Sequence, residues 1–427
     1  MAVTRRPADQ YPHRVAMVSL HTSPLETPGV GDAGGLNVYV AEVAHRLAER
    51  GLEVDVFTRR TDGTEPAVIE VAERLRVVNV DAGPAAPVAK EQLPALVPAF
   101  AAATALAAER YDVVHSHYWL SGLAALELGR RWRAPVVHTM HTMARVKNAA
   151  RGASPTVEPD VRERGELRVV READVLTANT TDESAELAHF YGARPERTVV
   201  VPPGVDLHTF HPCDQAKSRA QLGIAQDAEV VLFVGRIQPL KAPDVLIAAV
   251  ARLLARRPDR RGRLKLLVIG SPSGPEAAWS ASLPELAAEL GVTATVDFWP
   301  HSARADLFRW YCVSDVVGVP SYNESFGLVA LEAQACGRPV VATDVGGLRH
   351  AVLDGRTGTL VGGHDPDRWA DALEEQLDDR ELASRLGANA AVHASHYSWD
   401  NSAAATLEAY HQALARTGRP ATDGGRP

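Results

Sequence analysis

The chain has 427 residues, of which 46% are hydrophobic and 23% are charged, proportions typical of a soluble globular protein. It is too long for one ordinary hydrophobic core, and we therefore expect two domains. Its 53 acidic residues outnumber its 45 lysines and arginines, which gives a formal net charge of −8. This balance argues against a nucleic-acid-binding protein, which would carry a basic face.

The cysteines and the start of the chain indicate a cytoplasmic protein. Cys213, Cys312 and Cys336 are far apart, odd in number and in no CxxC motif, so they predict neither a disulfide framework nor a zinc site. Residues 1–12 lack the apolar core of a signal peptide, and we expect them to be disordered. The longest uncharged stretch, residues 92–108, is shorter than a membrane span, and we interpret it as a buried helix.

The chain opens with a strand–helix–strand unit. A short apolar strand, residues 14–20, precedes a glycine-rich loop, residues 21–37, then a helix from residue 38 and a strand over residues 52–58. Glycines in such a first turn allow backbone N–H groups to approach a phosphate closely. The glycine spacing is neither that of a dinucleotide-binding G-x-G-x-x-G motif nor that of a P-loop, so neither kind of site is predicted.

Two later strands end in histidines. Residues 111–119 (YDVVHSHYW) and 134–142 (APVVHTMHT) each run from an apolar strand into a polar segment. The histidines could suggest a metal, but carboxylate partners are absent nearby, and we predict no metal site. We expect these polar strand ends to face a shared cleft instead. The helix-prone residues 158–172 carry several arginines, most of which we interpret as a solvated face.

The alternation of strands and helices starts again after a proline-rich segment, residues 202–212, which we expect to link two domains. Further strands are predicted at residues 229–235, 264–270, 295–299, 316–319 and 339–343. Two such sets imply an α/β protein with two doubly wound parallel sheets and a cleft between them. We expect domains over residues 13–205 and 206–390, a final helix over 391–415 and a disordered tail over 416–427.

The most informative stretch is residues 320–332, PSYNESFGLVALE. It is typical of a loop at the carboxyl end of a strand that continues into a helix, and this is the edge where open α/β sheets bind ligands. Glu324 and Glu332, eight residues apart, can both face one polyhydroxylated ligand. The backbone N–H groups of residues 325–328 would lie at a helix N-terminus, where they favour an anion.

These patterns resemble a known family. The motif E-S-F-G-x-x-x-x-E is similar to the signature of retaining, nucleotide-sugar-dependent glycosyltransferases of family 4, whose GT-B fold has two facing Rossmann-like domains. Motifs such as GDAGGLNVYV, HSHYWLSG, HTMHT and GRIQPLKAP, within about residues 14–410, resemble one subgroup, the D-inositol-3-phosphate glycosyltransferases of mycothiol biosynthesis in actinobacteria. The resemblance implies transfer of N-acetylglucosamine from UDP-N-acetylglucosamine to 1D-myo-inositol 3-phosphate, with retention, by a homodimer. It also implies that the final helix crosses back to the first domain.

A nucleotide-sugar donor gives the cations of the second half a role. Breaking the sugar–phosphate bond leaves a diphosphate that gains negative charge, and fixed cations should face it. Arg236 and Lys241 lie five residues apart on one loop, where a guanidinium can hold two oxygens and an ammonium acts as a point charge. No general base is needed if the departing phosphate takes the acceptor's proton.

The resemblance also assigns residues to both substrates. It implies donor-binding roles for Gly34, Gly35, Asn37, Arg236, Lys241, Glu324 and Glu332, the last on the ribose hydroxyls. The residues that it implies in catalysis are Arg236, Lys241, Glu324 and His141, which would touch the transferred sugar. The acceptor's phosphate would be held by Lys90, Tyr118, Thr142 and Arg162, and its inositol ring by His21. A basic pair with two hydroxyl donors suits a phosphomonoester.

No cofactor is predicted as a requirement. Some members of the family are described with magnesium, but this sequence supplies no obvious carboxylate cage. We expect neither a nucleic-acid partner nor a membrane span.

Departures from the subgroup's pattern leave the acceptor open. Thr27, Met140, Met143, Arg145 and Leu167 stand where other residues are expected, and Arg145 adds a cation near the acceptor side. One alternative is a related transferase with another acceptor, as in sucrose-phosphate synthases or enzymes that act on other cyclitols. A second is an isomerase similar to UDP-N-acetylglucosamine 2-epimerases, which would leave the acceptor residues unused. A third is a non-catalytic sugar-nucleotide sensor, which could dispense with the charged residues that are present here.

Overall fold

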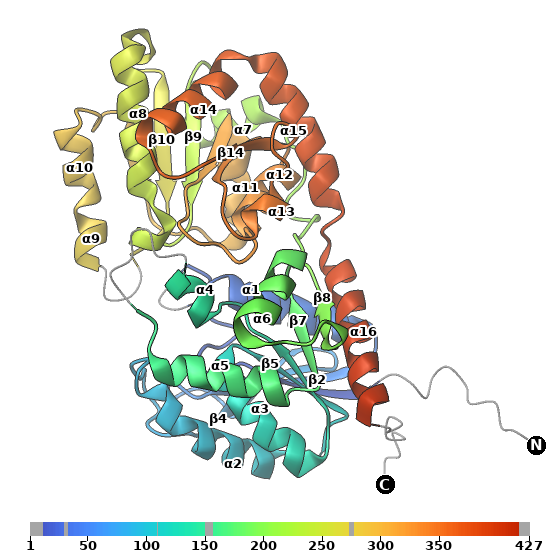
Figure 1. Ribbon diagram of the computed structural model, residues 1–427. Helices are drawn as coiled ribbons and strands as arrows, with labels where there is room; N and C mark the ends of the chain where they lie inside the picture. The colour runs from blue at the N-terminus through green and yellow to red at the C-terminus, as the bar shows by residue number, and fades with distance from the viewer. Residues whose placement is uncertain (1–11, 30–32, 109, 150–156, 273–276, 418–427) are drawn as a thin grey trace, which may run out of the picture.

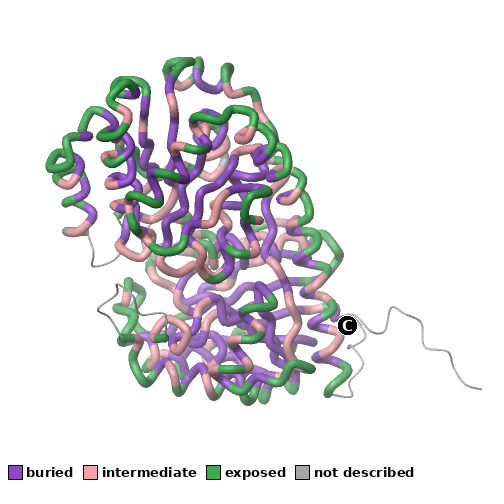
Figure 2. The backbone as a smooth tube through the Cα atoms, turned by 45° about the horizontal axis from the view of Figure 1, so that its top comes forward, coloured by how far each residue is buried: buried purple, intermediate pink, exposed green. Residues whose placement is uncertain are grey.

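The computed structural model describes residues 12–29, 33–108, 110–149, 157–272 and 277–417. The ends expected to be disordered, 1–12 and 416–427, lie outside the described residues except for 12, 416 and 417. The described chain forms two α/β units, one above the other in Figure 1, each built around one sheet. Figure 2 shows that buried segments fill the interior of both units and that exposed segments lie mainly on the outside.

The first sheet has eight strands in the order β3-β4-β2-β1-β5-β6-β7-β8. Their bounds are β1 (Arg14–Val18), β2 (Glu53–Arg59), β3 (Val68–Ala72), β4 (Leu75–Val80), β5 (Val113–His117), β6 (Val136–Thr139), β7 (Val175–Ala178) and β8 (Thr198–Val200). All neighbours pair in parallel except β3, which runs antiparallel to β4 at one edge. The central strands β1 and β5 are buried on both faces because helices cover both sides of the sheet.

The second sheet has six parallel strands in the order β11-β10-β9-β12-β13-β14. Their bounds are β9 (Glu229–Val234), β10 (Leu264–Ile269), β11 (Val296–Trp299), β12 (Val316–Val319), β13 (Val340–Thr343) and β14 (Gly358–Val361). The strand order reverses between β9 and β12, and in the first sheet between β1 and β5. Open α/β sheets bind ligands at the carboxyl ends of strands at such switch points.

Helices connect successive strands in both units. In the first they are α1 (Gly35–Glu49), η2 (Leu93–Leu96), α2 (Val97–Ala107), α3 (Trp119–Trp132), α4 (Ala144–Ala149), α5 (Asp160–Glu172), α6 (Thr181–Tyr191) and η3 (Pro195–Arg197). They continue with α7 (Gln215–Leu222), η4 (Pro239–Lys241), α8 (Pro243–Arg256), η5 (Pro258–Arg260), α9 (Ala277–Ala281), α10 (Leu283–Glu289), α11 (Arg304–Val313), α12 (Leu328–Ala335), α13 (Leu348–Ala351), α14 (Pro366–Asp378), α15 (Arg380–Ser395) and α16 (Trp399–Thr417). Among the described residues, no helix is both long and apolar enough to cross a membrane.

Several predicted elements differ from the structure. The strand predicted over 316–319 is β12, residue for residue, but β3, which is largely exposed, and β14, which begins at a glycine, were not predicted. The stretch 92–108 is two helices, η2 and α2, and Leu106 near its end is 87% exposed. Pro94 and Pro98 lie in the first turns of these helices, where a missing N–H costs no hydrogen bond. The single helix expected over 391–415 is the end of α15 and most of α16, with a break at 396–398.

Helix α16 runs from the second unit down the side of the first, as the red helix in Figure 1 shows. Its start is tied to the linker between the units, because the Val205 N–H donates to the Tyr397 carbonyl at 2.8 Å. The two segments approach so closely that a Cβ at Gly204 would lie 2.3 Å from the Trp399 nitrogen. Trp399 and Tyr410 are buried in one apolar cluster with α1 and the first sheet.

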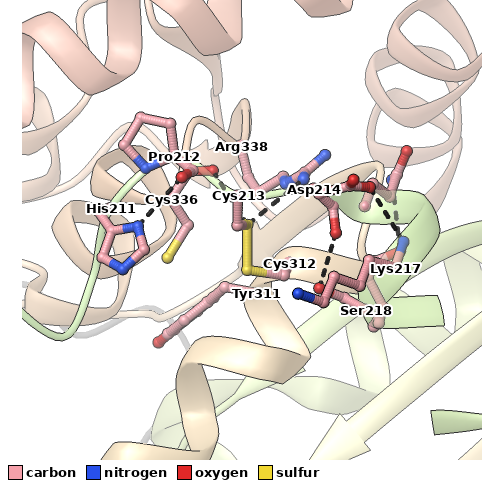
Figure 3. Close-up of a disulfide and its surroundings, with 12 residues drawn as sticks. His211, Pro212, Cys213, Asp214, Lys217, Ser218, Tyr311, Cys312, Cys336 and Arg338 are labelled. Carbon is pink, nitrogen blue, oxygen red and sulfur yellow. Dashed lines mark hydrogen bonds between the residues drawn. A yellow bond between two sulfur atoms is a disulfide. The ribbon is translucent and has the colours of Figure 1, made fainter. Parts of the chain in front are cut away.

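The expectation of no disulfide is wrong. Cys213, in the linker before α7, and Cys312, in α11, form a disulfide with Cα atoms 5.9 Å apart (Figure 3). Cys336 is a buried free thiol, and its carbonyl oxygen lies 3.9 Å from the Cys213 sulfur. The separation of 99 residues between the bonded cysteines gave no sequence signal, because only the packing of α7 and α11 brings them together.

We expect Trp399→Ala to lower the free energy of unfolding by about 3–5 kcal/mol, because it leaves a cavity where α16 meets the first unit. Urea unfolding measures the loss. Val392→Ala, on α15 and 63% exposed, is the matched control and should change stability by no more than about 0.5 kcal/mol. An equally small loss in both variants would contradict the packing described for α16.

Candidate active site

Two helix starts meet between the units. Helix α1 begins after Gly34, and a Cβ at Gly34 would lie 3.7 Å from the guanidinium of Arg236 in the second unit. A Cβ at Gly35 would lie 3.5 Å from Leu328, the first residue of α12. The glycine turn after β1, the loop after β9 and the N-terminus of α12 therefore converge at the carboxyl edges of both sheets. The two helix N-termini favour an anion at this place.

Asn37 holds the glycine turn in shape. Its Oδ1 accepts a hydrogen bond from the Gly34 N–H at 2.8 Å, and its Nδ2 donates to Thr22 Oγ1 at 2.6 Å and to the Ser23 carbonyl at 2.7 Å. The residue is 1% exposed. Asn37, which was predicted to contact the donor, thus uses both polar atoms of its side chain to fix the backbone that a ligand would meet.

The predicted cationic loop is a short turn. Lys241 ends η4, and the next residue, Ala242, has a φ of 51°, which turns the chain into α8. The Lys241 ammonium forms an ion pair with the Glu324 carboxylate, and their side chains are 21% and 20% exposed. Ser321 Oγ also donates to Glu324, at 3.4 Å. Lys241 and Glu324, both predicted to bind the nucleotide-sugar donor, are therefore in direct contact although they lie 83 positions apart.

Glu332 lies in α12 and is 7% exposed. The Tyr311 hydroxyl donates to its Oε2 at 2.8 Å, and Arg304 Nε lies 3.5 Å from its Oε1. Burial raises the pKa of Glu332, while Arg304 and Tyr311 lower it. Arg304 also donates to Glu42 of α1 at 2.6 Å, so it joins the two units. Sequence reasoning missed Tyr311, Arg304 and Glu42 because they belong to no motif.

His141 joins the first unit to the second through its backbone. Its φ is 61°, and its carbonyl accepts a hydrogen bond from Ser325 Oγ at 2.5 Å. Its Nε2 lies 3.0 Å from Nδ1 of His117, and its ring forms a T-shaped pair with the Tyr39 ring, with ring centres 5.1 Å apart. Burial, with a smaller effect of nearby histidines, lowers the pKa of His141 well below its ordinary value, so the ring is neutral.

Two other histidines lie inside the first unit. His115 is within 2.9 Å of both the Tyr410 hydroxyl and Thr139 Oγ1, and His138 is 2.8 Å from Ser116 Oγ. Both histidines are 0% exposed, so the expectation that all these strand ends face the cleft is wrong for them. Burial lowers the pKa of each to about 3. Within the described part of the chain, no three or more His, Cys, Asp or Glu side chains form a group that could hold a metal ion.

Four predicted acceptor residues lie together on the first unit. The ring of Tyr118 is 4.5 Å from that of His21, and the Arg162 guanidinium is 5.1 Å from the centre of the Tyr118 ring. Arg162 also donates to Thr142 Oγ1 at 2.9 Å. Arg162 is 4% exposed, whereas the side chain of Arg168 on the same helix is 46% exposed, in line with the solvated face expected there.

Lys90 belongs to the same neighbourhood. Burial is the largest cause of a lowered pKa at Lys147 in α4, and Arg162 and Lys90 add to it by repulsion. A hydrogen bond from β2 holds the loop that carries Lys90, because Arg59 donates to the Pro84 carbonyl at 2.8 Å. Sequence reasoning missed Lys147 because it belongs to none of the recognised motifs.

Arg145, the cation expected near the acceptor side, is held by partners on α5 and α6. Arg145 Nε lies 3.3 Å from Glu163, its NH1 donates to the Phe190 carbonyl at 2.6 Å, and its guanidinium lies 5.5 Å from the Tyr191 ring centre. None of these partners is a predicted acceptor residue. Arg145 instead ties α4 to α5 and α6.

Comparison with known proteins decides the family. The description "Glycosyltransferase Family 4" matches residues 33–209, and "Glycosyl transferases group 1" matches residues 214–393. A D-inositol 3-phosphate glycosyltransferase from Kineococcus radiotolerans is 54% identical over 415 residues, which cover 94% of this chain and 95% of that protein. A protein of the same name from Streptomyces scabiei is 52% identical over 409 residues, covering 94% and 92%. This chain belongs to the D-inositol 3-phosphate glycosyltransferase family.

Solved structures support the fold of this glycosyltransferase. A sucrose-phosphate synthase from Thermosynechococcus elongatus is 32% identical and has a TM-score of 0.87, with 95% of this chain and 100% of that one covered. WaaG, a glycosyltransferase involved in lipopolysaccharide biosynthesis, is 22% identical and shares the fold with a TM-score of 0.69, over 92% of this chain and 98% of that one. The predicted fold class, a GT-B fold of two facing Rossmann-like domains, is confirmed, and so is the predicted enzyme class, a hexosyltransferase.

We expect Arg236→Ala to reduce the kcat of this glycosyltransferase by roughly 10²- to 10³-fold, because the resemblance assigns this guanidinium to the leaving diphosphate. Release of UDP measures kcat. Arg252→Ala is the matched control, since the side chain of Arg252 is 61% exposed on α8. If both variants turn over equally, Arg236 is not part of the site.

We expect the free energy of unfolding to fall as the pH is lowered from about 7 to about 5. His115 and His138 stay neutral in the folded chain but bind protons in the unfolded chain below about 6.5. The unfolded state therefore binds more protons, and each ring costs roughly 1 kcal/mol of stability per pH unit. Urea unfolding across this range measures the slope. His138→Gln should flatten it and the exposed His208→Gln should not; an unchanged slope in His138→Gln would contradict the assignment.

Proposed function

We propose that this chain transfers N-acetylglucosamine from UDP-N-acetylglucosamine to 1D-myo-inositol 3-phosphate, with retention, as the first step of mycothiol biosynthesis. The observation that carries the proposal is the contact of Tyr118, Thr142 and Arg162 on the first domain, in a chain whose second domain brings Arg236 to the glycine turn. Relatives about half identical over nearly the whole chain are named for this acceptor, which supports the proposal.

The donor would lie with its diphosphate between the glycine turn of α1 and the loop after β9. Arg236 would bind two phosphate oxygens, and Lys241 would act as a point charge beside them. These fixed charges stabilise the diphosphate as its bond to the sugar breaks. Glu324, which is paired with Lys241, would accept hydrogen bonds from the sugar, and Glu332 would accept them from the ribose.

The acceptor hydroxyl loses its proton without a strong protein base. His141 is a weak base because burial lowers its pKa well below the ordinary value. The departing phosphate oxygen lies on the face from which the acceptor approaches when configuration is retained, and it takes this proton. The role of His141 is then to position the transferred sugar, from a backbone that Ser325 fixes through a hydrogen bond.

The acceptor would bind to the first domain. Its phosphate would meet the Arg162 guanidinium, the Lys90 ammonium and the hydroxyls of Thr142 and Tyr118, because charge-assisted hydrogen bonds bind phosphates most strongly. His21, packed against Tyr118, would contact the ring of the inositol. We further propose that the enzyme works in the cytoplasm. We also propose that it is a homodimer, and sedimentation of the purified protein would test this oligomeric state.

Sucrose-phosphate synthesis is the second candidate. It is favoured by the solved sucrose-phosphate synthase, which is 32% identical to this chain with a TM-score of 0.87. The phosphomonoester of a sugar acceptor would suit the same cations as that of inositol 3-phosphate.

An acceptor screen tests the proposed function. Purified protein is incubated with UDP-N-acetylglucosamine and, in turn, inositol phosphates, free inositol, fructose 6-phosphate and aminocyclitols, and UDP release is measured. We expect release to be fastest with inositol 3-phosphate. Fastest release with fructose 6-phosphate would replace this proposal with the second candidate, and interconversion of the sugar nucleotide without an acceptor would indicate an isomerase.

We expect Lys90→Ala to raise the KM for inositol 3-phosphate by about 10- to 100-fold, because it removes a hydrogen bond to a charged group. The KM for UDP-N-acetylglucosamine should not change. Steady-state kinetics with each substrate varied in turn separates the two effects. A loss of donor affinity as large as that of acceptor affinity would contradict the assignment of Lys90 to the acceptor.

A further inference from the structure

One carboxylate lies between two cations next to the acceptor residues. Glu158 Oε1 is 3.1 Å from the Lys147 ammonium, and Glu158 Oε2 is 2.8 Å from NH1 of Arg162. Arg162 has a second carboxylate partner, Glu166, at 2.7 Å, which is 0% exposed. Glu166 therefore balances the charge of Arg162 from the core side, and Glu158 meets it from the more exposed side.

Glu158 is held in place by its neighbours. Its backbone N–H donates to Asn148 Oδ1 at 2.9 Å, and Asn148 Nδ2 donates to Glu163 at 2.9 Å. The side chains of Glu158 and Lys147 are 23% and 28% exposed, so both remain within reach of a ligand. Each Glu158 oxygen thus bonds one cation, which is the arrangement that two oxygens of a phosphate adopt between two bases.

Three cations converge on this place. Lys147, Arg162 and Lys90 are close enough for the last two to disfavour the charged form of the first, after the larger effect of burial. Like charges gathered in a partly buried position need an anion. In the ligand-free chain, Glu158 supplies that charge to Lys147 and Arg162.

We propose that Lys147 is a further residue that binds the acceptor's phosphate, and that Glu158 is a resident counterion which this phosphate displaces. The inference rests on the proposed function in one respect only, that the acceptor is a phosphomonoester. It gives the site a basis for selectivity. A phosphate dianion replaces a carboxylate monoanion between the cations, whereas a neutral polyol cannot replace it and meets an already neutralised site.

Two variants test the proposal, each with a matched control. Lys147→Met keeps the length of the side chain and removes its charge, and Glu158→Gln keeps the shape of the carboxylate and removes its charge. Lys265→Met controls for loss of a lysine, since Lys265 pairs with Asp297 at 3.6 Å on β10. Glu172→Gln controls for loss of a carboxylate on α5, where Glu172 pairs with arginines that are exposed.

The measurements are the kcat and KM for the phosphorylated acceptor, the KM for UDP-N-acetylglucosamine, and the inhibition constant of inorganic phosphate against the acceptor. We expect Lys147→Met to raise the acceptor KM and the phosphate inhibition constant about tenfold, with kcat and the donor KM unchanged. Lys147→Arg should restore most of the loss. We expect Glu158→Gln to lower the phosphate inhibition constant by roughly three- to tenfold, because a competing charge is gone.

Two results would overturn the proposal. An acceptor KM in Lys147→Met equal to that of Lys265→Met would remove Lys147 from the site. Weaker phosphate inhibition in Glu158→Gln would show that Glu158 is a permanent structural partner instead of a displaced one. Inhibition by inorganic phosphate does not depend on which phosphorylated acceptor the enzyme uses, so a wrong acceptor in the proposed function would leave this test intact. Thermal unfolding of each variant separates loss of binding from loss of fold.

Discussion

Arg304 couples the two domains through one carboxylate on each. It donates to Glu42 of α1 in the first domain and lies 3.5 Å from Glu332 of α12 in the second. A guanidinium that is only one-quarter exposed needs carboxylate partners to offset the cost of desolvation, and here each domain contributes one. Glu332 is also the residue proposed for the ribose, so the contact between the domains and the proposed donor site share the Glu332 carboxylate. Separating the domains would take Glu42 away from the Arg304 guanidinium and leave it with Glu332.

The two proposed substrate sites both combine cations with a carboxylate that pairs with one of them. Both proposed ligands are anions, and each site carries a set of cations in a protein whose formal net charge is −8. In each set one lysine already forms an ion pair with a carboxylate: Lys241 pairs with Glu324, and Lys147 pairs with Glu158. The proposal for Glu158 makes acceptor binding an exchange of a protein carboxylate for a phosphate, which would favour ligands of higher negative charge.

Local patterns were enough to predict the two sheets, because alternating apolar strands and helices report burial directly. The strand β12 falls where the motif placed it, whereas the ion pair of Lys241 with Glu324 was not predicted, although both residues were assigned to the donor. The disulfide of Cys213 and Cys312, the bridge made by Arg304 and the role of Glu158 could not be predicted, because each depends on segments that only the tertiary fold brings together. The strand-end histidines show the opposite error: a polar pattern indicated a cleft, but most of its side chains satisfy one another inside the core.

A crystal structure of the enzyme with UDP and 1D-myo-inositol 3-phosphate tests the central claim most directly. The account predicts the diphosphate between the glycine turn after β1 and the side chains of Arg236 and Lys241. It predicts the acceptor's phosphate on the first domain, at Arg162 and Lys90. A diphosphate bound away from Arg236, or an acceptor phosphate held by the second domain, would contradict it.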